Sequence, residues 1–188
     1  MRKFIMFSLK RGMLLSAAIP MLVALVFSVM LTISQLQEYR QASQAEDMKG
    51  LIEVMSALIH EQQKERGATS VFLSSQGEQF GNELDAQRDL TNRATGSLFA
   101  VMEELASSTP PEISARLSEI SVTLSKRAEI RRSVDDLAIP TPEALQHYTA
   151  SNAEMLNTIA SIGALSENPR ITNHVASLEA ILSAKEFA

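Results

Sequence analysis

Residues 80–105 read FGNELDAQRDLTNRATGSLFAVMEEL, and this stretch decides the fold class. One set of mostly apolar side chains recurs at intervals of four and three residues, with charged and amide side chains between them. The set is Phe80, Leu84, Gln87, Thr91, Ala94, Leu98, Val101 and Leu105. This spacing is typical of an α-helix that buries one face, whereas a half-buried strand would alternate every second residue. The stretch therefore predicts a helix packed against other helices.

Stripes of the same period occur on both sides of this stretch. They lie between residues 51–73, 113–134, 145–162 and 171–182. The segments that separate the stripes are rich in glycine, proline and serine, which end helices. These segments are residues 77–81, 107–111, 139–142 and 168–169. The pattern predicts an all-α protein, in which short connections join the helices into an antiparallel bundle.

The N-terminal part has the composition of a membrane anchor. Residues 12–37 carry no charged side chain, and this uncharged run is long enough for the ~20 residues of a membrane-spanning helix. All four basic residues of the first 37 precede this run, and no acidic residue does. By the positive-inside rule, we predict a cytoplasmic tail at 1–12, a transmembrane helix at 13–36 and a domain at 37–188 outside the bacterial inner membrane. The alternative is a signal peptide cleaved near 42–45, although its apolar region would exceed the usual ~7–15 residues.

The composition of the exported part excludes several function classes. From residue 38 onward the chain has 13 basic and 22 acidic residues, a net charge of −9 that disfavours a nucleic-acid partner. The chain has no cysteine, and its three histidines are far apart in sequence, so neither disulfides nor a metal site is expected. No nucleophile–base pair, carboxylate dyad or phosphate-binding loop is evident. We therefore expect no cofactor and no enzymatic activity.

Arg66 is the most informative polar residue. It lies seven residues after Ile59 and eleven after Met55, so it is predicted to project from their apolar face, with Gln62 and Thr69 in adjacent turns. No acidic residue lies three or four positions from Arg66. A buried arginine needs an anion or several acceptors, because an unpaired buried charge is costly. The alternatives are a carboxylate from another helix, or a guanidinium that reaches water along its alkyl stem.

Two further arginines are candidates. Arg131 continues the stripe of Leu124 and belongs to a basic cluster at 126–132 in an otherwise acidic domain. The alternative for Arg131 is an ordinary helical ion pair with Asp135, four residues on. Arg88 lies on the flank of the 80–105 stripe, with an aspartate three residues before it.

The block LIHEQQKERGATSVFLSSQGEQFGNELDAQRDLT at residues 58–91 carries a family resemblance. Its Lys-Glu-Arg-Gly-Ala segment at 64–68, its Val-Phe-Leu-Ser-Ser segment at 71–75 and Gly77 resemble the opening of the NIT domain. The resemblance implies an all-helical sensor of nitrate or nitrite, as found outside the membrane in bacterial chemoreceptors and histidine kinases. Arg66 occupies the position of an arginine with which the family binds its ligand.

The resemblance also implies the rest of the functional prediction. The predicted ligand-binding residues are Arg66, Arg131, Gln62, Thr69 and Arg88. The chain is expected to be a homodimer and to signal through its transmembrane helix. The family pattern continues past Glu186, where a second arginine is expected beyond Ala188, so the domain is expected to be truncated at its C-terminus. The alternatives are a bundle that senses another small ligand, such as an organic acid, and a membrane anchor that binds a partner without any ligand.

Overall fold

The computed structural model describes residues 2–165, 172 and 175–177, and it separates the chain into two units, Met1–Gln44 and Ala45–Ala188. All regular secondary structure in the described ranges is helical, which confirms the predicted all-α class. The helices are α1 (Arg2–Ser74), α2 (Gly81–Glu104), α3 (Pro111–Ser125), α4 (Arg127–Asp135) and α5 (Thr141–Leu165). Helix α1 contributes residues to both units.

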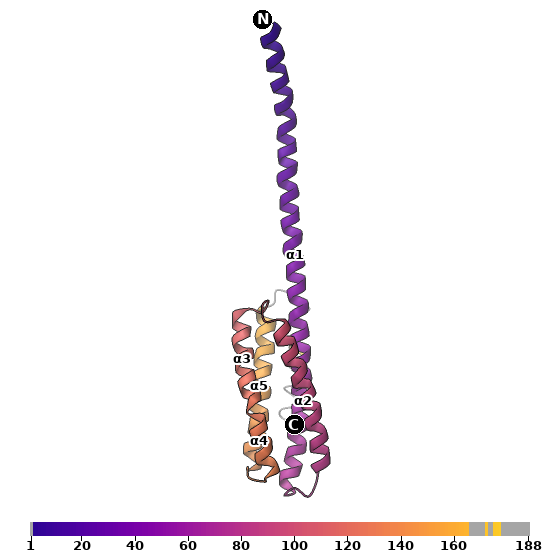
Figure 1. Ribbon diagram of the computed structural model, residues 1–188, viewed down its shortest axis with the longest axis vertical. Coiled ribbons are helices and arrows are strands. Elements are labelled where there is room, and N and C mark those ends of the chain that lie inside the picture. Colours follow the sequence, from indigo (N-terminus) through magenta and orange to yellow (C-terminus); the bar gives the residue numbers. More distant parts are fainter. Residues whose placement is uncertain (1, 166–171, 173–174, 178–188) are drawn as a thin grey trace. The chain divides into compact units, whose positions relative to one another are not determined.

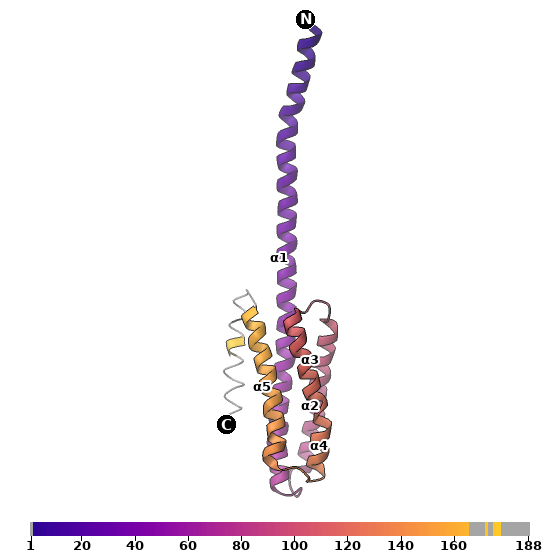
Figure 2. The same cartoon turned by 90° about the vertical axis from the view of Figure 1, so that its left-hand side faces the viewer.

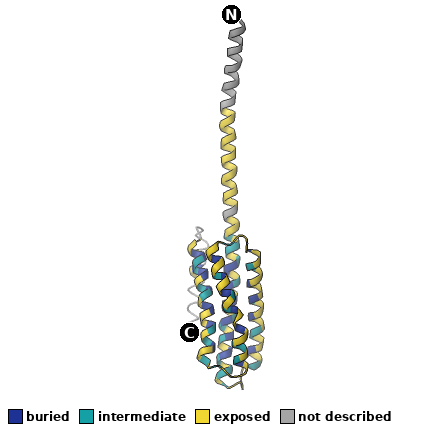
Figure 3. Ribbon diagram, turned by 60° about the vertical axis from the view of Figure 1, so that its left-hand side comes forward, coloured by how far each residue is buried: buried dark blue, intermediate teal, exposed yellow. Residues whose placement is uncertain are grey.

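The first unit consists of the N-terminal part of α1. Residues 20–39 are all exposed, including large apolar side chains such as Met21 and Phe27, as the yellow part of α1 in Figure 3 shows. Pro20 lies inside the helix, where its ring removes one backbone hydrogen bond. By length and composition this helix is able to cross a membrane, and a signal sequence would meet the same criteria.

The second unit is a helical bundle. Figures 1 and 2 show the C-terminal part of α1, then α2, then α3 with α4, then α5 running in alternating directions. Their facing stripes form the core, because each amphipathic helix can bury its apolar face only against the others. Fully buried core side chains include Leu51, Met55, Leu98, Ile120 and Ile159.

The 80–105 stripe is buried at its centre. Leu84, Thr91 and Leu98 are buried on α2, as predicted, and Leu105 is buried just beyond the end of the helix. Phe80 is exposed instead, because it precedes the first turn of α2 with a backbone φ of 65°. Because Phe80 does not have helical backbone angles, its side chain does not follow the helical spacing, and the buried stripe begins at Leu84.

The predicted single helix at 113–134 is wrong in one respect, because the chain forms two helices. Helix α3 ends at Ser125 and α4 begins at Arg127. The intervening Lys126 keeps helical backbone angles (φ −72°, ψ −18°), so the break shifts the period little. Leu124 and Arg127 on either side of the break are both buried, as one continuous stripe predicts.

Three of the four predicted breaks are confirmed by the ends of the helices. Between α1 and α2 the backbone reverses at Gly77, whose φ of 82° suits a residue without a Cβ, and its N–H donates to the Phe72 carbonyl. The fourth predicted break and most of the predicted fifth helix lie outside the described residues. Of that helix, Val175 is described, and it is buried in the core against Gly163.

Candidate functional site

A polar cluster interrupts the apolar core around Glu65. Arg131 of α4 donates from Nε to Oε1 and from Nη2 to Oε2 of this carboxylate, each at 2.7 Å. The Arg131 Nη1 atom donates to the Asn92 side chain of α2 at 2.7 Å, and the Tyr148 hydroxyl of α5 donates to Glu65 Oε1 at 2.9 Å. The Glu65 side chain is 0% exposed and that of Arg131 14%. Four helices are thus joined through the ion pair of Glu65 and Arg131.

The electrostatics of this cluster follow from burial and charge. Burial alone would raise the pKa of Glu65, but the hydrogen bonds and charge of Arg131, helped by Thr91 and Tyr148, hold that pKa below its ordinary value. The pKa of Tyr148 is raised, first by burial and then by the negative charge of Glu65. Glu65 is therefore a carboxylate, and Tyr148 a neutral donor to it, over the physiological pH range.

A second polar layer lies next to the first. Arg127, only 7% exposed, donates from Nη2 to the hydroxyl of Thr95 at 2.9 Å. Its Nη1 atom and both side-chain polar atoms of Gln62 are buried without a hydrogen-bond partner among the described residues. Burial lowers the pKa of Arg127, and the positive charge of Arg131 lowers it further. This layer combines a buried cation with unused hydrogen-bonding capacity.

Arg66 is half-buried, and its Nη1 atom donates to the Thr149 hydroxyl of α5 at 3.1 Å. The predicted inward position is instead taken by Glu65, the preceding residue. Gln62 and Thr69, which were expected one turn on either side of Arg66, are both fully buried. The guanidinium of Arg66 thus lies at the edge of the polar layers, where α1 faces α5.

The other two predicted arginines are held by carboxylates. Arg88 binds Asp135 at 2.7 Å and Asp85, three residues before it, at 3.5 Å. Because Asp135 binds Arg88, the alternative that paired it with Arg131 is not realised in this arrangement, and Arg131 binds Glu65 of α1. An anion would have to displace these carboxylates to reach the two arginines.

Glu65 was not among the predicted site residues, and Arg127 was predicted only as a member of the basic cluster at 126–132. A signal was present for Glu65, because residues 58, 62, 65 and 69 follow each other at intervals of four, three and four, the period of the buried face. Arg66 was predicted to face the core instead, because it lies seven and eleven positions after two apolar residues of the same helix. Glu65 and Arg66 are adjacent in sequence, so their side chains point about 100° apart around the helix, and only one of them can face the core.

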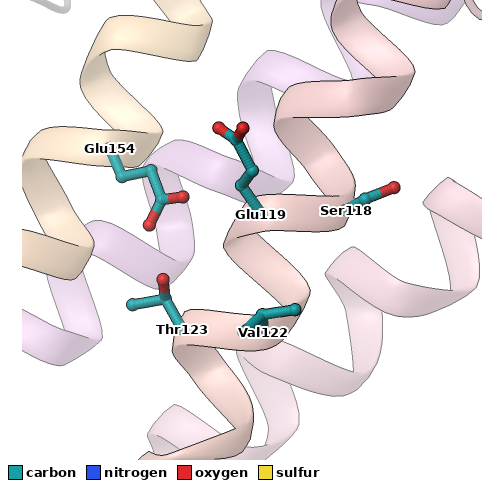
Figure 4. A pocket seen from close by; sticks show the side chains of 5 residues that line it. All are labelled: Ser118, Glu119, Val122, Thr123 and Glu154. Carbon is teal, nitrogen blue, oxygen red and sulfur yellow. The ribbon is translucent and has the colours of Figure 1, made fainter.

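The surface also carries an open groove between α3 and α5, lined by Ser118, Glu119, Val122, Thr123 and Glu154. Figure 4 shows the side chains of Glu119 and Glu154 on facing helices, so this groove is unsuited to an anion. Over the described part of the chain, no group of three or more histidine, aspartate or glutamate side chains is arranged to hold a metal ion.

A family model described as nitrate and nitrite sensing, NIT, matches residues 57–188. The chain belongs to the NIT family. The matched residues include both polar layers and Arg66. The resemblance inferred from residues 58–91 is therefore confirmed.

Two relatives of this NIT protein illustrate the family. The nitrate regulatory protein of Klebsiella oxytoca is 26% identical over 154 residues, which cover 82% of this chain and 38% of that protein. The solved structure of the NasR transcription antiterminator superposes with a TM-score of 0.75 at 24% identity, covering 86% of this chain and 44% of that one. The second likeness shows the shared fold. This NIT protein thus spans less than half the length of either relative.

Proposed function

We propose that this protein is a membrane-anchored sensor whose NIT domain binds nitrate or nitrite outside the cell membrane and signals through α1. The observation that carries the proposal is the family match over residues 57–188, the part of the chain that contains the arginine-rich polar layers. In the proposed topology residues 1–12 lie in the cytoplasm, 13–36 span the membrane and 37–188 form the sensor. The basic N-terminus and the exposed apolar helix support this topology.

Arg66 is the proposed primary ligand for the anion. Nitrate is planar and singly charged, and a guanidinium can donate two parallel hydrogen bonds to two of its oxygens. The Arg66 side chain is half-buried, and its Nη1 atom donates to the neutral hydroxyl of Thr149 on the facing helix α5. Thr69, in the next turn of α1, would supply a further hydrogen bond.

Arg131 and Arg88 have a different part in the proposed mechanism. Each contacts a carboxylate in the structure, so each would reach the anion only by exchanging that partner. Competition between a bound anion and Glu65 for Arg131 would move α4 relative to α1. Since α1 also carries the apolar segment, such a shift is a route for a signal, and two copies of α1 in a homodimer would transmit it in parallel.

The ligand is tested by calorimetry on the purified 188-residue chain in detergent, with nitrate, nitrite, chloride and sulfate. Arg66→Ala is expected to weaken nitrate binding at least about tenfold, because a charge-assisted hydrogen bond contributes ~1.5–3 kcal/mol. The matched control is Arg93→Ala, an exposed arginine of α2. Unchanged nitrate affinity in Arg66→Ala would refute the role of Arg66. Preference for an organic acid over nitrate would favour the alternative ligand class.

The topology is tested by cysteine labelling, which is straightforward because the chain has no native cysteine. Ser8→Cys and Ser74→Cys each introduce one thiol for a membrane-impermeant maleimide. We expect Ser74→Cys to react in intact cells whose outer membrane has been made permeable, and Ser8→Cys to react only after lysis. The opposite result would reverse the topology. Loss of the N-terminal segment in the mature protein, seen by mass spectrometry, would indicate a cleaved signal peptide.

A further inference from the structure

The interior of the bundle contains a layer of polar atoms for which neither the ion-pair cluster nor the proposed role of Arg66 accounts. Arg127 Nη1, Gln62 Nε2 and Oε1, and Ser151 Oγ are buried and have no hydrogen-bond partner within residues 2–165, 172 and 175–177. All three residues are more than nine-tenths buried. Buried polar groups in native proteins are almost always paired, so these atoms point to an additional component.

The register of the helices places these atoms at one level. Glu65 contacts Arg131 and Tyr148, which aligns α1 with α4 and α5. One turn from each of these residues, moving toward the N-terminus of α1, lie Gln62, Arg127 and Ser151. Because α1 is antiparallel to α5, three residues back on α1 and three residues forward on α5 move in the same direction along the bundle (Figure 2).

Two hydrogen bonds between α4 and α2 independently show that Arg127 lies one turn from Arg131 in the same direction along the bundle. Arg131 contacts Asn92, and Arg127 contacts Thr95, three residues further along α2. The second layer therefore draws side chains from α1, α2, α4 and α5, as the first layer does. Its three residues with unused donors come from α1, α4 and α5 and face the same buried level.

The charges of the two layers do not balance. Arg127 and Arg131 are both cations, and Glu65 is in contact with Arg131 alone of the two. Both oxygens of Glu65 are occupied by Arg131, and one of them also accepts from Tyr148. Arg127 meets a neutral hydroxyl, Thr95. Among the residues that the structure describes, one positive charge thus has no carboxylate in contact with it in a low-dielectric interior, which is costly if nothing offsets it.

We propose that the layer of Gln62, Arg127 and Ser151 is an interior binding site for one small monovalent anion, a halide or nitrate, separate from Arg66. Arg127 Nη1, Gln62 Nε2 and the Ser151 hydroxyl donate to the anion. A single negative charge neutralises the excess charge of the two layers, whereas a divalent anion would reverse it. A bulky organic anion would force apart three helices that enclose these donors. Water would satisfy the hydrogen bonds but leave the charge of Arg127 unpaired.

The test uses bromide as the probe, with the 188-residue chain in detergent and isethionate as the background anion at constant ionic strength. We expect the thermal midpoint of the bundle to rise with bromide concentration, because an anion that binds only the folded state stabilises it by mass action. Arg127→Gln retains polar donors but removes the charge, so it is expected to abolish the bromide dependence. The matched control is Arg132→Gln, an exposed arginine on the same helix.

Arg66→Ala separates this proposal from the proposed function. A bromide response kept in Arg66→Ala and Arg132→Gln but lost in Arg127→Gln supports the interior site, whether or not nitrate sensing is correct. The proposal is overturned if the unaltered chain shows no response, if Arg127→Gln still responds, or if Arg66→Ala loses the response. Should Arg127→Gln not fold, anomalous scattering from crystals of the unaltered chain grown with bromide decides the question. A peak within hydrogen-bonding distance of Arg127 Nη1 supports the site, and its absence there refutes it.

Discussion

Arg131 and Glu65 are 66 positions apart in sequence, yet the guanidinium and the carboxylate share two hydrogen bonds of 2.7 Å inside the bundle. The pair joins α4 to α1, and Tyr148 and Asn92 extend it to α5 and α2. A two-point contact fixes the relative rotation of two helices as well as their distance. The ion pair therefore sets the register of the polar layers, and its loss should destabilise the bundle.

Arg131→Ala is expected to lower the free energy of unfolding by about 3–5 kcal/mol, because it leaves the carboxylate of Glu65 buried without its cation. Urea unfolding of the chain in detergent, followed by circular dichroism, measures the change. The control is Arg132→Ala, which removes an exposed arginine from the same helix and should change the stability by no more than about 0.5 kcal/mol. Equal stabilities of the two variants would show that the ion pair contributes nothing net.

Tyr148→Phe is expected to cost about 1–2 kcal/mol of unfolding free energy. The ring remains to fill the core, but Glu65 Oε1 loses a buried hydrogen bond of 2.9 Å. Tyr39→Phe provides the control, because Tyr39 is 74% exposed. The same urea titration compares the two, and a Tyr148→Phe variant as stable as Tyr39→Phe would contradict the importance of this hydroxyl.

The stability of the bundle is expected to fall as the pH drops below about 6.5, the ordinary pKa of histidine, in part through His147. Burial lowers the pKa of this imidazole in the folded protein, and the charge of Arg127 lowers it further. Protonation below pH ~6.5 therefore favours the unfolded chain, where the pKa is higher. His147→Gln should make the thermal midpoint less dependent on pH between 7 and 5. A slope that matches the unaltered protein would exclude this contribution, and His60→Gln serves as the exposed control.

Two glycines are expected to respond to alanine in opposite ways. A Cβ at Gly163 would lie 2.9 Å from Val175 Cγ1 and 3.1 Å from its Cβ, so Gly163→Ala should destabilise the bundle by roughly 1–3 kcal/mol through overpacking. A Cβ at Gly96 would have nothing within 4 Å, so Gly96→Ala should stabilise α2 by about 0.5–1 kcal/mol. Thermal unfolding of both variants checks the signs, and a stabilising Gly163→Ala would show that Val175 moves freely.

Local sequence was sufficient for the helices. The stripe of α2 and the breaks at its two ends follow from spacing and from glycine and proline, which act within a few residues. The same local reasoning predicted burial of Leu117 and Leu124 but placed them with Arg131 on one helix. It missed the break at Lys126, because a one-residue interruption with helical angles leaves the period almost unchanged.

The candidate site was only partly predictable. Arg131 was singled out as a candidate ligand-binding residue, and Asp135, the local partner that the alternative gave it, contacts Arg88 of α2. Glu65 was overlooked although its spacing from Leu58 fits the buried face. Which carboxylate meets which arginine depends on the rotation and register of helices that are distant in sequence, and no local pattern contains that information.

By itself, then, the sequence determined the class of the protein: an apolar N-terminal segment able to span a membrane, an acidic helical bundle and the NIT signature at residues 58–91. The reason is that hydropathy, helical period and helix-ending residues act over short stretches of chain. Only the tertiary structure decided that Glu65 rather than Arg66 points into the core, and that Arg127 is buried beside Thr95 with no carboxylate of the described residues in contact with it. The reason is that burial and pairing of charges arise where separate helices meet.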